Sequence, residues 1–123
     1  MHDIPMRIVV VDDDMFTAEL TGMALEAAGY EVVIAEGGFD ALEKISENGP
    51  VGAVVSDMNM PFMSGVELFE ELGRQQFAAP FILLTGEDAR TLTAAHPGIE
   101  AVLPKDERFQ EALPELLDAL LGR

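Results

Sequence analysis

The sequence predicts a three-layer α/β fold, in which helices cover both faces of a parallel five-stranded sheet. Two observations predict it. Short apolar runs alternate along the chain with stretches whose apolar residues recur at helical spacing, five times in all. Most of the runs are apolar throughout, which is typical of strands buried on both faces. Right-handed crossovers between such strands build a three-layer sandwich, and we expect the strand order 2-1-3-4-5.

Composition excludes several classes of protein. With 123 residues, 49% of them hydrophobic, the chain is expected to form one domain over residues 1–123. No apolar run approaches the roughly 18 residues of a membrane span, and the start MHDIPMR does not resemble a signal peptide, so we expect no membrane insertion. The absence of cysteine excludes disulfides and thiolate sites and favours the cytoplasm. A net charge of −16 argues against direct binding to nucleic acid.

The first strand is predicted at residues 7–11, a β-branched run that three aspartates follow. A helix comes next, and Asp13 or Asp14 could cap it, since a carboxylate at a helix start meets unpaired N–H groups. Gly29 is expected to end this helix. Its predicted apolar face consists of Phe16, Leu20, Met23, Ala24 and Ala27.

The second strand is predicted at residues 31–35, and the turn beyond it contains two glycines. A short helix follows, with Phe39, Leu42 and Ile45 as its apolar positions, and the sequence Asn-Gly-Pro at 48–50 closes it.

The third strand, residues 51–56, leads into the stretch VVSDMNMPFMSG. Ser64 and Glu67 have the capping-box spacing and should start the third helix. The apolar positions of that helix include Val66, Phe69 and Leu72.

The last two strand–helix pairs follow Pro80, which a strand tolerates at its beginning. We expect the fourth strand at 81–84, a weakly apolar helix at 87–95 and the fifth strand at 99–103. The final helix has a clear apolar stripe of Phe109, Leu113, Leu116, Leu117 and Leu120.

Polar residues stand at the ends of four predicted strands: Asp12 with Asp13, Asp57, Thr85 and Lys105. The carboxyl ends of parallel strands meet at one edge, so these residues should converge. Clustered carboxylates repel and raise a pKa unless a cation joins them, and magnesium is a cation that carboxylates and phosphate oxygens bind. A lysine charge and a threonine hydroxyl suit phosphoryl oxygens. The set favours phosphoryl transfer.

Each of these residues also has an ordinary structural explanation. Asp57 could begin a turn, Asp13 could be a helix cap, and Thr85 has capping-box spacing to Asp88. Lys105 alone would be read as a solvated surface lysine. Their coincidence at four strand ends favours the functional interpretation.

At these positions the sequence closely resembles the receiver domain of bacterial two-component response regulators. The matching motifs are VVVDDD, SDMNMPFMSG, FILLTG and LPK, which occur in the family's order across the whole chain. The resemblance implies a flavodoxin-like fold of five β–α units.

The resemblance also implies roles for individual residues. Asp57 would attack a phosphoryl donor and become an aspartyl phosphate, while Lys105 and Thr85 bind the phosphoryl oxygens. Magnesium would be held directly by Asp13, Asp57 and the backbone carbonyl of Asn59, with Asp12 acting largely through water. The predicted catalytic residues are therefore Asp57, Thr85 and Lys105, and the predicted metal ligands are Asp12, Asp13, Asp57 and Asn59.

Partners follow from the same resemblance. The donor would be the phosphohistidine of a histidine kinase or histidine phosphotransfer protein, and the output would be a change in binding to an unidentified protein target. The protein would assist its own phosphorylation and dephosphorylation but would have no separate substrate. Asn59 and Glu87 occupy the positions that tune self-dephosphorylation in the family.

Two residues depart from the family pattern. Asp106 replaces the usual proline after the lysine, and because a cis bond before a non-proline residue costs about 2.5–4 kcal/mol, we expect trans geometry and a rearranged loop there. Val102 replaces the usual Tyr or Phe, whose rotation reports phosphorylation. Our hypothesis is that switching runs through Thr85 and the fourth helix.

Two other functions stay open at this point. Asp12-x-Asp14 fits the nucleophile motif of haloacid-dehalogenase-like phosphatases, although that motif gives Asp57 no role. The chain could also be a receiver that acts as a docking module without phosphorylation. It could be a stand-alone regulator or the receiver of a longer one.

Overall fold

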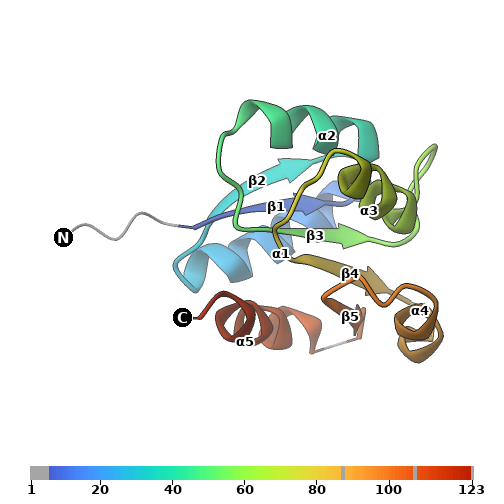
Figure 1. Cartoon of the computed structure of the whole chain (residues 1–123). Helices are drawn as coiled ribbons and strands as arrows, with labels where there is room; N and C mark the ends of the chain where they lie inside the picture. The colour runs from blue at the N-terminus through green and yellow to red at the C-terminus, as the bar shows by residue number, and fades with distance from the viewer. Residues whose placement is uncertain (1–5, 87, 107, 123) are drawn as a thin grey trace.

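The computed structural model describes residues 6–86, 88–106 and 108–122, and within them five strands alternate with five helices (Figure 1). The strands are β1 (Arg7–Val11), β2 (Glu31–Ala35), β3 (Ala53–Asp57), β4 (Phe81–Thr85) and β5 (Ala101–Pro104). The helices are α1 (Met15–Ala27), α2 (Gly38–Glu47), α3 (Gly65–Arg74), α4 (Ala89–Ala95) and α5 (Phe109–Leu121). All strand pairs are parallel, and the order β2-β1-β3-β4-β5 is the predicted one.

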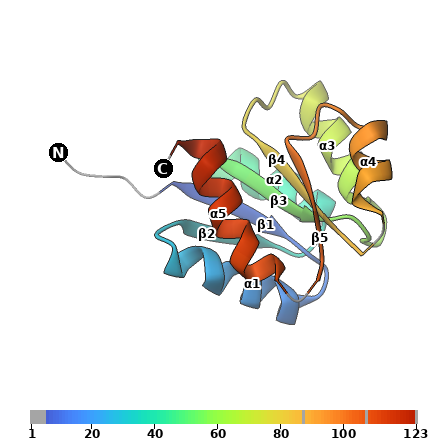
Figure 2. The same ribbon diagram turned by 90° about the horizontal axis from the view of Figure 1, so that it is seen from below.

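The sheet separates two apolar clusters. Because side chains alternate along a strand, Val9 and Val11 of β1 face one cluster while Ile8 and Val10 face the other. Helices α2 and α3 cover the first cluster, and α1 and α5 cover the second. Figure 2 shows α1 and α5 side by side in front of the sheet. The predicted three-layer sandwich is therefore confirmed.

The predicted apolar face of α1 is wrong. Phe16 is 70% exposed and Met23 is 63% exposed, whereas the residues that α1 buries are Ala18, Thr21, Gly22 and Leu25. These four have the spacing i, i+3, i+4, i+7, and their mostly small side chains let the helix approach β2 closely. A Cβ at Gly22 would already lie 3.3 Å from Val32 Cγ1. Helix α1 therefore turns Phe16 and Met23 outward and keeps Leu25 as its one large buried residue.

The stripe of α5 is confirmed, because Leu113 and Leu117 are fully buried and Phe109, Leu116 and Leu120 pack against the same cluster. No helix among the described residues is long and apolar enough to cross a membrane.

The helix caps resolve one open question. The carboxylate of Asp14, not that of Asp13, accepts hydrogen bonds from the backbone N–H groups of Phe16 (3.0 Å) and Thr17 (3.3 Å) at the start of α1. At the start of α3, the predicted capping box is complete: Ser64 Oγ accepts from the Glu67 N–H at 3.1 Å, and the Glu67 carboxylate accepts from the Ser64 N–H at 2.9 Å.

Several element boundaries differ from the prediction. Strand β3 begins at Ala53 instead of residue 51 and includes Asp57, which pairs with Leu84. Strand β4 extends to Thr85, and β5 covers 101–104 instead of 99–103. Proline at 104 is tolerated because β5 is an edge strand. The ends of these strands are set by hydrogen bonding to the neighbouring strands, which the local sequence pattern does not reveal.

Helix α4 begins at residue 89 instead of 87, and Asp88 is its cap, with its carboxylate accepting from the Arg90 N–H at 2.9 Å. Thr85 therefore does not cap this helix. The predicted role of Glu87 lies outside the described residues.

Candidate functional site

Four of the predicted site residues come together at the carboxyl edge of the sheet: Asp12, Asp13, Asp57 and Lys105. Asp12 follows β1 directly, Asp57 is the last residue of β3, and Lys105 follows β5. One carboxylate oxygen from each of Asp12, Asp13 and Asp57 lies within 4.8 Å of the others. Because the Asp12–Asp13 pair, Asp57 and Lys105 come from three segments that are distant in sequence, the parallel sheet is what brings them together.

Asp12 is fixed in place by contacts at both of its oxygens. Asp12 is only 2% exposed. Its Oδ1 accepts a hydrogen bond from the backbone N–H of Asp14 at 2.9 Å. Its Oδ2 accepts a hydrogen bond from Lys105 Nζ at 3.2 Å. A buried carboxylate needs such partners, since an unpaired one would be costly.

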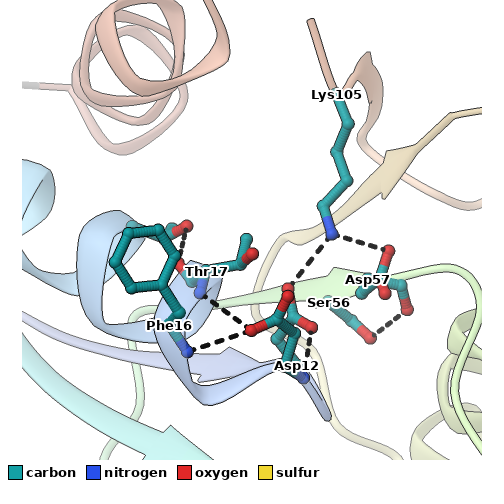
Figure 3. A network of polar contacts seen from close by, with 8 residues as sticks. Asp12, Phe16, Thr17, Ser56, Asp57 and Lys105 are labelled. Carbon is teal, nitrogen blue, oxygen red and sulfur yellow. Dashed lines mark hydrogen bonds and ion pairs between the residues drawn. The ribbon is translucent and has the colours of Figure 1, made fainter.

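Lys105 forms ion pairs with the carboxylates of both Asp12 and Asp57. Its Nζ lies 3.2 Å from Asp12 Oδ2 and 3.2 Å from Asp57 Oδ1. Figure 3 marks both contacts with dashed lines. Its backbone N–H donates to the carbonyl oxygen of Thr85 at 2.7 Å. With a side chain only 23% exposed, it is not a solvated surface lysine. The described residues contain no cis peptide bond, so the expected trans geometry before Asp106 is confirmed, and Lys105 nevertheless reaches the cluster.

The electrostatics of the cluster follow the prediction that clustered carboxylates raise a pKa. Burial raises the pKa of Asp57, Lys105 offsets part of this effect, and the charges of Asp12 and Asp13 raise the pKa further. Burial alone lowers the pKa of Lys105, but the charges of Asp12 and Asp57 outweigh it and the net shift is upward. Lys105 is therefore a stable cation at neutral pH, and an additional cation would favour the ionised form of Asp57.

The donor set fits a hard divalent cation. Three carboxylate oxygens at this spacing are ligands of the kind that magnesium binds in proteins, together with waters and phosphate oxygens. Asn59 lies exposed in the β3–α3 connection, and the role of its carbonyl stays a prediction. Thr85 is fully buried at the end of β4, and the role of its hydroxyl also stays a prediction.

Sequence reasoning missed two residues that support Asp57. Ser56 Oγ donates to the carbonyl oxygen of Asp57 at 2.9 Å (Figure 3). Gly65 packs against the same carbonyl: a Cβ at this position would lie 2.5 Å from Asp57 O and 2.5 Å from Leu83 Cδ1. The motif contained this glycine, but only the close approach of α3 to β3 explains it.

Comparison with known proteins decides the family. A family model described as the response regulator receiver domain matches residues 8–117. The chain belongs to the response regulator receiver domain family. This membership confirms the resemblance found in the sequence and does not favour the phosphatase alternative.

Relatives of this receiver domain are response regulators. The response regulator MprA of Mycobacterium sp. strain KMS is 35% identical over 122 residues, which are 98% of this chain and 52% of that protein. The transcriptional regulatory protein GlrR of Escherichia coli K12 is 34% identical, over 98% of this chain and 27% of that protein. The receiver chain thus spans about half the length, or less, of these two relatives.

Solved receiver structures share the fold. A response regulator receiver domain protein from Clostridium thermocellum superposes with a TM-score of 0.85 at 26% identity, covering 96% of this chain and 95% of that one. The response regulator protein TrrA of Thermotoga maritima, solved in complex with Mg²⁺ and BeF, gives a TM-score of 0.83 at 34% identity, with coverage of 94% and 99%. The flavodoxin-like fold is thereby confirmed. Receiver domains of response regulators are signalling domains that take phosphoryl groups from histidine kinases.

Proposed function

We propose that residues 1–123 form one receiver domain that accepts a phosphoryl group on Asp57 from a phosphohistidine donor. One observation carries this proposal. Asp57 is an 8% exposed carboxylate at the end of β3, and its Oδ1 lies 3.2 Å from Lys105 Nζ in a cluster with Asp12 and Asp13. The Asp57 carboxylate can attack a phosphorus atom once the negative charge of the phosphoryl group is neutralised, and Lys105 supplies part of the positive charge that this needs.

In the proposed reaction, a carboxylate oxygen of Asp57 attacks the phosphorus atom of the donor. The new P–O bond forms as the P–N bond to the donor imidazole breaks, and the imidazole leaves. Lys105, already within ion-pair distance of Asp57, binds a phosphoryl oxygen, and the Thr85 hydroxyl donates to another. Because the acceptor carboxylate belongs to the protein itself, no separate substrate is needed.

Magnesium is the proposed cofactor. Asp12, Asp13 and Asp57 would hold it, with the backbone carbonyl of Asn59 as a further ligand, and Asp12 would act largely through water. Bound magnesium supplies positive charge to the phosphoryl oxygens and relieves the repulsion among the carboxylates. The related TrrA of Thermotoga maritima, solved with Mg²⁺, supports this assignment.

Asp57 is a better nucleophile candidate than Asp12. Both oxygens of Asp12 already accept hydrogen bonds, and the residue is 2% exposed, so it has a structural task and little access. The same set of charges also argues against a docking module that does not use phosphate, because three clustered carboxylates cost stability without a function for them.

The proposed partners are a histidine kinase or histidine phosphotransfer protein as donor, and a protein target whose binding changes on phosphorylation. Direct binding of this chain to nucleic acid is not part of the proposal, because a net charge of −16 opposes it. The cytoplasmic location stays a prediction.

The proposal is tested by intact mass. The protein is incubated with acetyl phosphate and magnesium, and the mass is expected to increase by one phosphoryl group that hydroxylamine removes. The gain should be absent in Asp57→Asn and after addition of a chelator. A gain that persists in Asp57→Asn and disappears in Asp12→Asn would overturn the assignment, and no gain in a folded protein that binds magnesium would favour the docking module.

A further inference from the structure

A pocket opens beside the acidic cluster, between the β2–α2 and β3–α3 connections. Its volume is about 240 Å³, and the residues that line it include Asp13, Glu36, Asp40, Phe39 and Phe62. Figure 1 shows these two connections at the edge of the molecule where the strands end. Asp13 belongs both to this pocket and to the candidate metal cluster.

The two aromatic rings are not explained by packing. Phe39 is 65% exposed and Phe62 is 95% exposed. Phe62 also has a φ of 69°, in the left-handed region that favours glycine and is a genuine outlier for a bulky residue. Strained residues of this kind persist where the surrounding structure or a function requires them. The Phe62 ring is thus held in solvent although its backbone conformation is unfavourable.

The charges of the pocket select the sign of its occupant. Asp40 is already engaged, since its carboxylate accepts the Glu36 N–H at 2.9 Å and lies 3.1 Å from Lys44 Nζ. The carboxylate of Glu36 has no hydrogen bond or ion pair within the part of the chain that the structure describes. Asp13 adds negative charge to the pocket only while the metal cluster to which it belongs holds no cation. A carboxylate without a partner, beside two exposed aromatic residues, attracts a cation.

We infer that this pocket receives an arginine or lysine side chain of a partner protein. A cation there would contact ring faces and carboxylates at once, and protein interfaces are enriched in such aromatic and arginine contacts. The volume of about 240 Å³ is below the range of roughly 300–1,000 Å³ that drug-sized ligands occupy, so it suits one side chain. A second copy of this chain is disfavoured, because two copies with a net charge of −16 repel each other.

The pocket lies next to the candidate phosphorylation site, so a partner bound there would lie close to Asp57. A partner seated on Phe39 and Phe62 reaches Asp13, so it lies against the edge of the sheet that contains Asp57. This step rests on the proposed function, whereas the chemistry of the occupant does not.

The test titrates the ¹⁵N-labelled protein with the blocked tripeptide acetyl-Leu-Arg-Leu-amide and follows backbone amide shifts. The matched probe replaces arginine with citrulline, which has nearly the same shape but no charge. The variants are Phe62→Gly and Glu36→Gln, and the control is Gln76→Gly. Gln76 is the other non-glycine residue with positive φ among those described (61°), so its substitution relieves similar strain at a distance from the pocket.

We expect the arginine peptide to shift the amides of residues 36–40, Phe62 and Met63. Binding should be about tenfold weaker for the citrulline peptide and for the variants Phe62→Gly and Glu36→Gln, and unchanged for Gln76→Gly. Urea unfolding should show that Phe62→Gly is at least as stable as the wild type. Three results would overturn the inference: no shifts at millimolar peptide, equal binding of both peptides, or wild-type binding by Phe62→Gly. Concentration-dependent shifts of the same amides without peptide would assign the pocket to self-association instead. Phosphorylation by acetyl phosphate is measured separately, and Phe62→Gly is expected to retain it.

Discussion

At the residue scale, the ionised form of Asp57 opposes folding. Burial and the charges of Asp12 and Asp13 raise its pKa above the ordinary value of 3.8, although Lys105 reduces the shift. When the folded-state pKa exceeds the unfolded one, the stability is full below the unfolded pKa. It is then lost as the pH rises through the folded pKa. Ionised Asp57 therefore costs stability at neutral pH when no metal is bound.

Asp57→Asn should accordingly raise the free energy of unfolding at pH 7 in the absence of divalent cations. The gain should shrink as the pH falls toward the unfolded value of 3.8, because the wild-type carboxyl then becomes neutral as well. Urea denaturation of both proteins over a pH series measures the difference. A variant that is less stable than the wild type at pH 7 without metal contradicts the argument.

Asp40→Asn is the matched control with the opposite sign. The Glu36 N–H and the nearby Lys44 lower the pKa of Asp40, although burial opposes them. Its ionised form therefore supports folding above the unfolded pKa, and that support is lost as the pH falls through the lowered value. Asp40→Asn should reduce stability at pH 7, and the reduction should fade in acid.

Lys105→Met tests the cation that joins the carboxylates. Removing the lysine leaves Asp12 and Asp57 buried without a counter-charge, and breaking a fully buried pair typically costs about 3–5 kcal/mol. Because the Lys105 side chain retains 23% exposure, we expect a smaller loss of about 1–3 kcal/mol at pH 7. Thermal and urea unfolding measure it, and magnesium should restore part of it.

The control for this prediction is Arg74→Met, which breaks the ion pair with Glu71 at 2.8 Å on the surface of α3. Arg74 is 67% exposed, so the loss should stay within about 1 kcal/mol. Equal losses of stability for the two variants would mean that Lys105 stabilises the folded protein no more than a surface ion pair does.

At the scale of the elements, close packing of α3 against β3 positions the site. Gly65→Ala would place a methyl group 2.5 Å from the backbone oxygen of Asp57, and a backbone atom cannot rotate away as a side chain can. We expect a loss of about 1–3 kcal/mol in stability, as overpacked sites show. Phosphorylation of Asp57 by acetyl phosphate should also slow, because the strand end that carries the carboxylate shifts.

Gly73→Ala, in the same helix, is the control of opposite sign. A Cβ at Gly73 meets no atom within 4 Å, so alanine should stabilise the helix by about 0.5–1 kcal/mol. If both substitutions had the same sign, helix propensity rather than packing against Asp57 would explain the result.

The same scale shows what sequence could and could not predict. Apolar runs and helical spacing predicted all ten elements and the strand order, because these depend on local patterns and on general rules of connection. The face of α1 could not be predicted, since burial favours the small residues Ala18 and Gly22 over Phe16. The convergence of Asp12, Asp13, Asp57 and Lys105 was predictable, because parallel strands end at one edge of the sheet. The close contact of Gly65 was not, because it depends on the distance between two elements.

Among the helices that the structure describes, α4 is the most weakly anchored. It has seven residues, none of which is buried, whereas α3 has four buried residues in ten. Few buried apolar contacts imply a low free energy of local opening. Amide hydrogen exchange at residues 88–96 should therefore be faster than in α3. If switching runs through Thr85 and this helix, phosphorylation should change the protection of residues 86–98, and unchanged protection would contradict that hypothesis.

At the scale of the whole molecule, the charge balance opposes the compact state. With 23 acidic and 7 basic residues, the net charge is −16, and like charges repel more strongly when they are brought together by folding. Salt shortens the range of this repulsion, since the Debye length falls from about 30 Å at 0.01 M to about 10 Å at 0.1 M. We expect sodium chloride to raise the melting temperature over this range.

Magnesium should stabilise the protein beyond this screening effect. A ligand that binds only the folded state adds about 2.7 kcal/mol at 100 times its dissociation constant, whereas screening depends only on ionic strength. Melting curves in magnesium chloride and sodium chloride at equal ionic strength separate the two effects. The increment should disappear in Asp13→Asn, whose carboxylate belongs to the cluster at the carboxyl edge of the sheet, while the response to sodium chloride remains. If the two salts are equivalent for the wild type, the three carboxylates do not form a metal site, and their repulsion must be balanced by Lys105 alone.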